Sequence, residues 1–597
     1  MTGNSEHFDA VVIGSGFGGS VMSYRLASAQ MRVCLLERGK PYPPNSFARA
    51  PYDLSRNFWD PSEGLYGMFN VWSFRGSGAV VSSGLGGGSL IYANVLLRKD
   101  EAWFKEDLPD GSAWKWPIQY ADLDDHYGAV ERMMNAQRYP LAHAPYDRTP
   151  KTLAMQEAAA KLNPDGSPTL RWMPLNLAVS FRAKPVDHPS DDSGDNPPRL
   201  GEPLIEAHPN IHGMTRDTCR LCGECDLGCN YGSKNSLDYN YISAAHRHGA
   251  DVRTLCEVKT IDALPSASPR FAVTYVQHDP ERFGGQKIDT DDRHRFPRIR
   301  ITCDRLILAA GTFGTSYLLF SNRAALPQLS PTLGTRYSVN GDLLSFIVNA
   351  TRGKNGATVP RPLEACRGPV ITGAIRYGDT LDGQGAVGRG FYVEDGGHPA
   401  LLSWTAELSG IAGYLRRLIH FARLNLTYRF GKRRDTDLGA EIAALLGECI
   451  TSRTSMPVLT MGRDCPTGRL KFDGHHLDCD WDERDSAPYY DRVEREVTKI
   501  ATALGAKYVD NPAFKWNFHQ VLSAHPLGGC PMGETAARGV VNADGEVFGY
   551  PGMYITDGSV MPGPVGANPS LTIAAFADRA ADRIIAGASP SHRGSTA

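Results

Sequence analysis

The chain has 597 residues, too many for one compact hydrophobic core, so we expect two or more folded regions. A hydrophobic content of 42% and a charged content of 21% are typical of a globular enzyme. The formal net charge of −2 excludes the strongly basic balance that favours nucleic acid.

The first ten residues show neither a basic nor an apolar signal segment, and no apolar run approaches the roughly 20 residues of a membrane span. We therefore expect a cytoplasmic protein whose cysteines are mostly reduced.

The first predicted element is a strand–helix–strand unit over residues 8–38. It contains a strand at Ala10–Ile13, the GxGxxG glycines Gly14, Gly16 and Gly19, a helical pattern, and a second strand at Val33–Leu36. In a dinucleotide site these glycines permit a tight turn, the approach of a pyrophosphate and close helix packing, and the pyrophosphate lies at the helix N-terminus. Glu37, which ends the second strand, can bind ribose hydroxyls, so an unphosphorylated ribose, as in FAD or NAD, is favoured over NADP.

A glycine-rich loop with the sequence SGLGGGSLIYAN occupies residues 83–94. Gly86, Gly87 and Gly88 follow one another, and each costs backbone entropy within a helix or a strand. Such a run suits a backbone pressed against a flat ligand such as a flavin ring, and a flexible loop is the alternative. Further along, residues 114–137 predict a helix-rich connection and residues 183–203 a surface excursion.

Four cysteines follow with the spacing C-x2-C-x2-C-x3-C, at Cys219, Cys222, Cys225 and Cys229. This is a bacterial ferredoxin spacing, although Asn230 stands where proline is usual. Four thiolates in so short a segment could hold an iron–sulfur cluster. Reduced thiols packed in a turn, or a redox-labile pair, are the alternatives.

Residues 251–261 predict a pair of strands, and residues 305–322 predict a buried strand, a glycine turn and a helix. A strand that delivers Gly311 and Gly314 to a helix start is a second nucleotide-facing turn. We therefore expect the nucleotide domain to be assembled from segments that lie far apart in the sequence.

Residues 336–514 have a different pattern, with strand-like alternation at Gly368–Arg376 and Gly388–Val393 that predicts an antiparallel sheet in a second domain. Within it, residues 409–434 contain seven Lys and Arg and no acid, with apolar residues at helical spacing. A basic amphipathic helix can lie on a membrane surface, whereas a packed helix with a solvated basic face is the alternative.

The C-terminal part returns to glycine-rich chain of the nucleotide type. In HPLGGCPMG, residues 525–533, the backbone of His525 is held extended by the proline that follows it. A strand at Met553–Thr556 leads through Asp557 into a Gly/Pro loop and a helix. Asn568 is a favourable N-cap and Pro569 a favourable first helical residue, but an asparagine that caps its own helix cannot also face a ligand.

Together these segments resemble the glucose–methanol–choline (GMC) flavoprotein oxidoreductases, and among them the bacterial cholesterol oxidases with non-covalent FAD. The resemblance is weakest over residues 336–514. It is carried by GSGFGGS at 14–20, GLGGGSLIYAN at 84–94, GCNYGSKNSLDYNYI at 228–242, AAGTFGT at 309–315, HPLGGC at 525–530 and DGSVMPGPVGANPSLTIAAFADR at 557–579.

The resemblance implies FAD and the oxidation of an alcohol, with His525 and Asn568 at the reactive edge of the flavin. The steroid oxidases also use a glutamate to move a steroid double bond, and Glu394 in GFYVEDGGHP is the best match, a strand-end carboxylate being its alternative. The predicted cofactor-binding residues are Gly14, Ser15, Gly16, Phe17, Gly18, Gly19, Glu37, Gly86, Gly87, Gly88, Ser89, Asn94, Val258, Gly311, Asp557, Gly558, Asn568 and Pro569.

The predicted fold is α/β, with a Rossmann-like FAD domain in separated segments and a substrate domain with an antiparallel sheet and helices. The expected divisions are FAD-binding segments at 1–125, 205–335 and 515–590, a connection with lid excursions at 126–204, and a substrate domain at 336–514. The expected reaction oxidises a sterol 3β-hydroxyl with O2, with or without isomerisation. An alcohol dehydrogenase that uses another acceptor through an iron–sulfur centre, and a flavin-binding redox sensor that uses Cys219–Cys229, are the alternatives.

Overall fold

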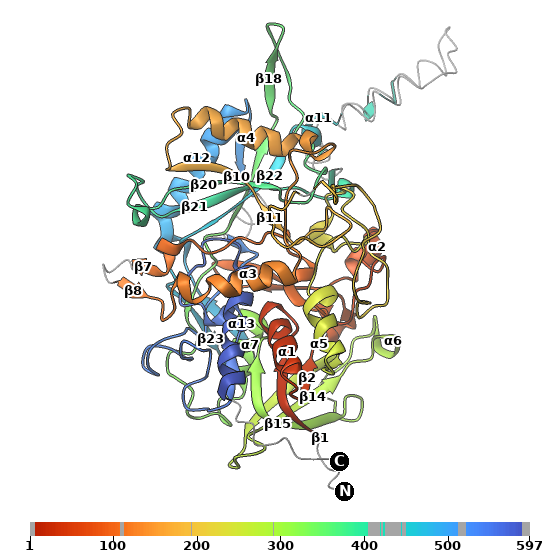
Figure 1. Ribbon diagram of the computed structural model, residues 1–597, viewed down its shortest axis with the longest axis vertical. Coiled ribbons are helices and arrows are strands. Elements are labelled where there is room, and N and C mark those ends of the chain that lie inside the picture. Colours follow the sequence, from red (N-terminus) through yellow and green to blue (C-terminus); the bar gives the residue numbers. More distant parts are fainter. Residues whose placement is uncertain are drawn as a thin grey trace.

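The computed structural model describes residues 6–107, 113–192, 194–290, 292–403, 449–511 and 521–587, together with residues 407, 418, 419, 422, 423 and 443. Two large sheets organise these residues (Figure 1). One is a mixed sheet of seven strands, and the other is an antiparallel sheet of six.

The mixed sheet has the strand order β12-β2-β1-β15-β14-β13, with β27 paired to β15. Strands β12, β2, β1, β15 and β27 run parallel, whereas β14 and β13 are antiparallel. All four residues of β2 are buried, as expected for a parallel strand covered on both faces. The strands are β1 Glu6–Ile13, β2 Val33–Leu36, β12 Asp251–Arg253, β13 Cys256–Ala263, β14 Phe271–Gln277, β15 Arg298–Leu308 and β27 Met553–Ile555.

Helices α1 (Phe17–Ser28), α3 (Asp124–Met133) and α13 (Pro569–Gly587) pack together beside this sheet (Figure 1). The Asp578 carboxylate on α13 joins all three, because it accepts from Arg25 on α1 and lies 2.7 Å from Nδ1 of His126 on α3. The C-terminal helix is thereby fixed against the first helix of the chain.

The antiparallel sheet has the order β10-β20-β21-β22-β17-β25 and is covered by α4 (Pro150–Leu162) and α12 (Ala487–Ala503) (Figure 1). All five residues of its strand β21 are buried, including Glu394 and Asp395. The sheet thus carries two carboxylates into its interior. Its strands are β10 Leu170–Pro174, β17 Leu343–Val348, β20 Gly373–Tyr377, β21 Phe391–Asp395, β22 Met456–Gly462 and β25 Lys507–Asp510.

The α/β class, the nucleotide-type sheet built from separated segments and the antiparallel sheet agree with the sequence-based expectations. Strand β10 was not predicted, since it comes from the connection at 126–204 and joins the second sheet beside β20. The expectation that the glycine run avoids helix is corrected in part. Gly87–Leu90 forms a 3₁₀ turn that the chain enters through Gly86, whose φ is 112°.

The basic segment at 409–434 lies outside the described residues apart from 418, 419, 422 and 423. Within the ranges that the structure describes, no helix combines the length and the apolar character needed to cross a bilayer.

Candidate active site

A cavity of about 520 Å³ is lined by residues from both sheets, a size within the usual range of roughly 300–1,000 Å³ for ligand pockets. Gly14, Glu37, Ala309 and Asp557 line it, and each directly follows or lies close after the carboxyl end of a parallel strand. Strand β1 has β2 on one side and β15 on the other, so the cavity opens at a topological switch point of the sheet. Ligands of open α/β sheets bind at this place.

Among the glycines that line the cavity, some are packed against other backbone and others face open space. A Cβ on Gly14 would lie 2.4 Å from the Ala309 carbonyl oxygen, and one on Gly18 would lie 1.9 Å from that of Thr556, so these positions are closed by the chain itself. A Cβ on Gly16, Gly88 or Gly311 would meet nothing within 4 Å, although all three residues line the cavity. Three separate segments therefore expose bare backbone to one open space, which fits a dinucleotide such as FAD.

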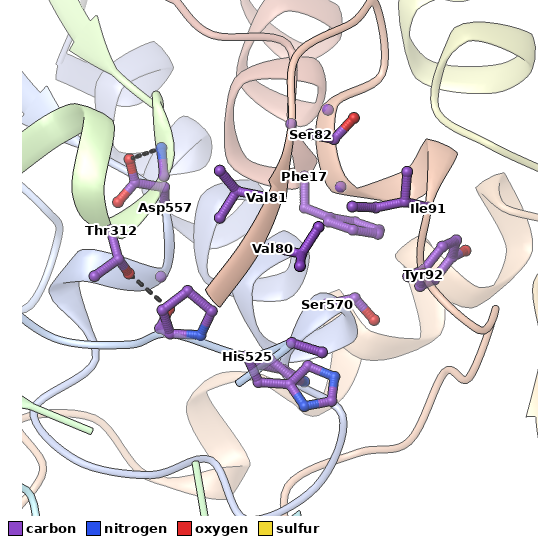
Figure 2. A pocket seen from close by; sticks show the side chains of 18 of the residues that line it. Phe17, Val80, Val81, Ser82, Ile91, Tyr92, Thr312, His525, Asp557 and Ser570 are labelled. Carbon is purple, nitrogen blue, oxygen red and sulfur yellow. Dashed lines mark hydrogen bonds between the residues drawn. The ribbon is translucent and has the colours of Figure 1, made fainter. Parts of the chain in front are cut away.

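Two carboxylates tie these segments together. Glu37 accepts from the Ser15 backbone N–H at 3.0 Å and hydroxyl at 2.6 Å through Oε2, and from the Gly39 N–H at 2.8 Å through Oε1. Oε1 keeps acceptor capacity toward a ribose hydroxyl. Asp557 accepts from the Gly311 N–H at 2.9 Å (Figure 2). It also accepts from the Ser559 N–H at 2.9 Å. Burial raises the pKa of Asp557.

Most of the predicted cofactor-binding residues line the cavity, and Gly19, Gly86, Ser89 and Asn94 do not form part of its wall. Gly86 and Ser89 act behind it, since the Gly86 N–H donates to the Ser15 hydroxyl at 2.9 Å and Ser89 donates to the Gly86 carbonyl at 2.7 Å. The predicted residues in the wall are Gly14, Ser15, Gly16, Phe17, Gly18, Glu37, Gly87, Gly88, Val258, Gly311, Asp557, Gly558, Asn568 and Pro569.

His525 also lines the cavity (Figure 2). Its Nδ1 lies 2.8 Å from Oδ1 of Asp342, a fully buried residue immediately before β17. The sequence analysis missed Asp342, which stands 183 residues away from His525 and belongs to no recognisable motif. The following Pro526 is fixed as well, because its carbonyl accepts from the Thr312 hydroxyl at 2.7 Å (Figure 2).

Asn568 and Glu394 meet at the cavity. Asn568 Nδ2 lies 3.5 Å from Oε2 of Glu394, while Asn568 Oδ1 and Glu394 Oε1 have no hydrogen-bond partner among the described residues. Asn568 stands at the N-cap position of α13, but its side-chain oxygen accepts no bond from the helix, so of the two expected roles the one that faces the cavity is favoured. Pro569 is confirmed as the first helical residue. Burial raises the pKa of Glu394 to about 8, against the opposing effect of the bond from Asn568.

The cavity wall formed by the antiparallel sheet and its neighbours is largely apolar. Glu394 itself does not line the cavity, but Gly396 and Gly397 just beyond it do. This part of the wall can accept a hydrocarbon surface. Its apolar residues include Leu344, Val370, Ile371, Pro457, Leu459 and Leu522.

The four clustered cysteines are free thiols that line one small separate cavity together with Lys234. Within the described part of the chain, no three His, Cys, Asp or Glu side chains are grouped as a metal site. Burial raises the pKa of the Cys222 thiol to about 12 and also raises that of Cys225. The structure therefore gives no support to an iron–sulfur cluster, and the Cys222 and Cys225 thiols are poor nucleophiles.

Comparison with known proteins agrees with this geometry. The GMC oxidoreductase family model matches residues 477–577. The chain is 26% identical to a cholesterol oxidase of Acinetobacter baumannii, over 97% of this chain and 95% of that protein. It is 28% identical to a cholesterol oxidase of Mycobacterium tuberculosis (strain ATCC 25618 / H37Rv), over 96% and 90%. A long-chain-alcohol oxidase of Arabidopsis thaliana is 21% identical, over 97% of this chain and 67% of that protein.

Among solved structures, pyridoxine 4-oxidase from Mesorbium loti matches with a TM-score of 0.54 at 15% identity, over 96% of this chain and 98% of that one. This likeness shows a shared fold. The predicted resemblance to the GMC oxidoreductases is confirmed by the family match and by these relatives. The family implies FAD, which fits the open glycine backbone described above.

Proposed function

We propose that the protein oxidises the 3β-hydroxyl of a sterol such as cholesterol to the ketone with FAD, reducing O2 to H2O2. The observation that carries this proposal is one cavity lined by His525, Asn568 and an apolar wall, with Glu394 in contact with Asn568. The cholesterol oxidases to which the chain is similar support the same substrate class.

When bound, FAD supplies the acceptor for the hydride that leaves the carbinol carbon. His525 is the group that receives the hydroxyl proton, since an imidazole suits proton transfer near neutral pH. Asn568 precedes the first residue of α13, so the positive end of this 19-residue helix faces the same region of the cavity. Its dipole stabilises negative charge that develops there.

Glu394 would carry out isomerisation, by taking a proton next to the new ketone and returning it further along the ring system. A carboxyl with a pKa near 8 is largely neutral at pH 7 and becomes a base as the pH rises. Its Oε1 has no hydrogen-bond partner among the described residues, and Gly396 and Gly397 just beyond Glu394 line the cavity.

The two alternative functions have weaker support. An alcohol dehydrogenase that uses an acceptor other than O2 is compatible with the cavity. An iron–sulfur relay needs cysteines that bind metal, and a thiol sensor needs reactive cysteines. The raised pKa of the Cys222 thiol disfavours the sensor.

The test is an anaerobic visible spectrum of the purified holoprotein before and after cholesterol is added, and again after air is admitted. Epicholesterol, the 3α epimer, is the matched control because it presents the carbinol hydrogen on the opposite face. Bleaching by cholesterol alone, with recovery and peroxide formation in air, supports the oxidase. Bleaching without recovery indicates a dehydrogenase, and no bleaching rejects cholesterol as the substrate.

A further inference from the structure

The five residues just before β17, Ser338–Asp342, contact both sides of the proposed reaction centre. Asn340 Nδ2 donates to the Ala567 carbonyl at 3.0 Å, and its Oδ1 accepts from the Gly566 N–H at 2.8 Å. Asp342 contacts His525. Asn340 and Asp342 are both fully buried. One short segment therefore fixes the position of the loop before Asn568 relative to the His525 imidazole.

The Asp342 carboxylate is surrounded by donors. Its Oδ2 accepts from the backbone N–H groups of Ala524 at 2.8 Å and His525 at 3.1 Å, and from the Ser523 hydroxyl at 3.1 Å. Its Oδ1 is left to Nδ1 of His525 at 2.8 Å. Because an ionised carboxylate can only accept hydrogen bonds, the hydrogen of this last contact belongs to Nδ1.

We propose that Asp342 is a positioning residue that holds neutral His525 as the Nδ1–H tautomer and leaves Nε2 as a bare acceptor for the substrate hydroxyl proton. The proposal rests on the proposed alcohol oxidation. The substrate O–H bond breaks, its proton goes to Nε2, and its electron pair forms the carbonyl bond as the carbinol C–H pair leaves as hydride to FAD. Asp342 stays unprotonated throughout and stabilises the imidazolium that forms.

The three donors at Oδ2 make Asp342→Asn an unusually sharp test. Only the amide oxygen can take the Oδ2 position, since it must accept from two N–H groups and a hydroxyl. The amide NH2 then takes the Oδ1 position and donates to Nδ1. The variant keeps the hydrogen-bond count but inverts the tautomer, so that Nε2 carries the hydrogen and cannot accept the substrate proton.

The matched control is Asp464→Asn. Asp464 is also fully buried and accepts from the same segment, from the Ser338 hydroxyl at 2.6 Å and the Val339 N–H at 3.2 Å. Within the described part of the chain, Asp464 makes no hydrogen bond or ion pair with His525. A fall in the rate of flavin reduction in both variants would indicate damage to the Ser338–Asp342 segment. A fall in D342N alone would indicate a changed protonation of the His525 imidazole.

The kinetic measurement is anaerobic stopped-flow reduction of the bound flavin by the alcohol that reduces the wild-type protein. We expect D342N to lower the limiting reduction rate by roughly 10²–10⁴-fold. The substrate dissociation constant should stay within about threefold of wild type, and the spectrum of the bound flavin should not change. D464N should stay within about threefold in both constants. A D342N limiting rate within threefold of wild type would overturn the proposal.

A second measurement needs neither a substrate nor the D342N variant. Nitrogen NMR of wild-type holoprotein with 15N-labelled histidine, assigned by comparison with His525→Gln, should show a protonated Nδ1 and an unprotonated Nε2 at pH 8. The reverse tautomer overturns the proposal even if D342N fails to fold. If no alcohol reduces the flavin while the Nδ1–H tautomer is observed, the proposed function fails and the assignment of Asp342 stands.

Discussion

The two ends of the cavity satisfy their polar groups in different ways. At the dinucleotide end, both oxygens of Glu37 and both oxygens of Asp557 accept hydrogen bonds from the chain's own N–H and hydroxyl donors. At the antiparallel-sheet end, Glu394 Oε1 and Asn568 Oδ1 are buried without a partner among the residues described. A buried unsatisfied polar group costs about 1–3 kcal/mol, and two of them at residues in contact support the proposed ligand site at this end.

His525 stands between these two cases, because Nδ1 is bonded to Asp342 whereas Nε2 has no hydrogen bond to the part of the chain that the structure describes. We expect His525→Gln to give the largest effect, a fall of roughly 10²–10⁴ in the rate of flavin reduction, equivalent to about 3–5 kcal/mol. Glutamine can orient a hydroxyl but cannot take its proton. Stopped-flow reduction measures this, and the FAD content should not change. A loss of FAD in the same variant would mean that His525 belongs to the cofactor end.

Two glycines at the cofactor end allow an effect on folding to be separated from an effect on FAD binding. Gly14→Ala places a Cβ 2.4 Å from the Ala309 carbonyl at a residue with φ of 98°, and should lower the free energy of unfolding by roughly 3–4 kcal/mol. Gly16 has φ of −69° and open space, so Gly16→Ala should fold normally and bind FAD at least about tenfold more weakly. Chemical unfolding of the FAD-free proteins and FAD titration separate the two effects. Equal losses of stability in both variants would contradict the distinction between a glycine required by packing and a glycine required by the cofactor.

The same contrast explains how far the sequence could predict the molecule. The cofactor end comes from local motifs, in which a strand, its glycines and a helix are contiguous, so β1, α1, β15 and α13 could be placed directly. The chemistry end depends on contacts between distant residues. Glu394 meets Asn568 across 174 residues and Asp342 meets His525 across 183, and neither pair has a spacing that a sequence displays.

The choice between the two expected roles of Asn568, helix cap and ligand contact, depended on a distant residue as well. Propensity describes what an asparagine does at an isolated helix start, whereas here a buried carboxylate 3.5 Å away occupies its amide group. Strand β10 was missed because it pairs with β20, which lies about two hundred residues later in the chain.

Glu394 should leave a distinct signature in stability. Its pKa of about 8 in the folded protein lies above the ordinary value of 4.5, so the folded state holds a proton that the unfolded state releases. The resulting stabilisation is complete below about pH 4.5 and is lost as the pH rises toward 8. Relative to wild type, Glu394→Gln should therefore gain on the order of 4 kcal/mol between pH 4.5 and pH 9. Urea unfolding at both pH values measures the gain, and parallel curves would place Glu394 in a solvated site.

Glu37→Gln should give the smallest effect, because it changes a group that the chain already satisfies. Oε2 accepts from the Ser15 N–H and hydroxyl and Oε1 from the Gly39 N–H, so an amide NH2 must face a donor on one side or the other. The loss of one charged acceptor toward a ribose hydroxyl and one loop contact should weaken FAD binding about tenfold, or roughly 1–1.5 kcal/mol. The rate of flavin reduction in the FAD-saturated variant should stay within about twofold of wild type. A slower reduction at full saturation would show that the two ends of the cavity are coupled through the position of the cofactor.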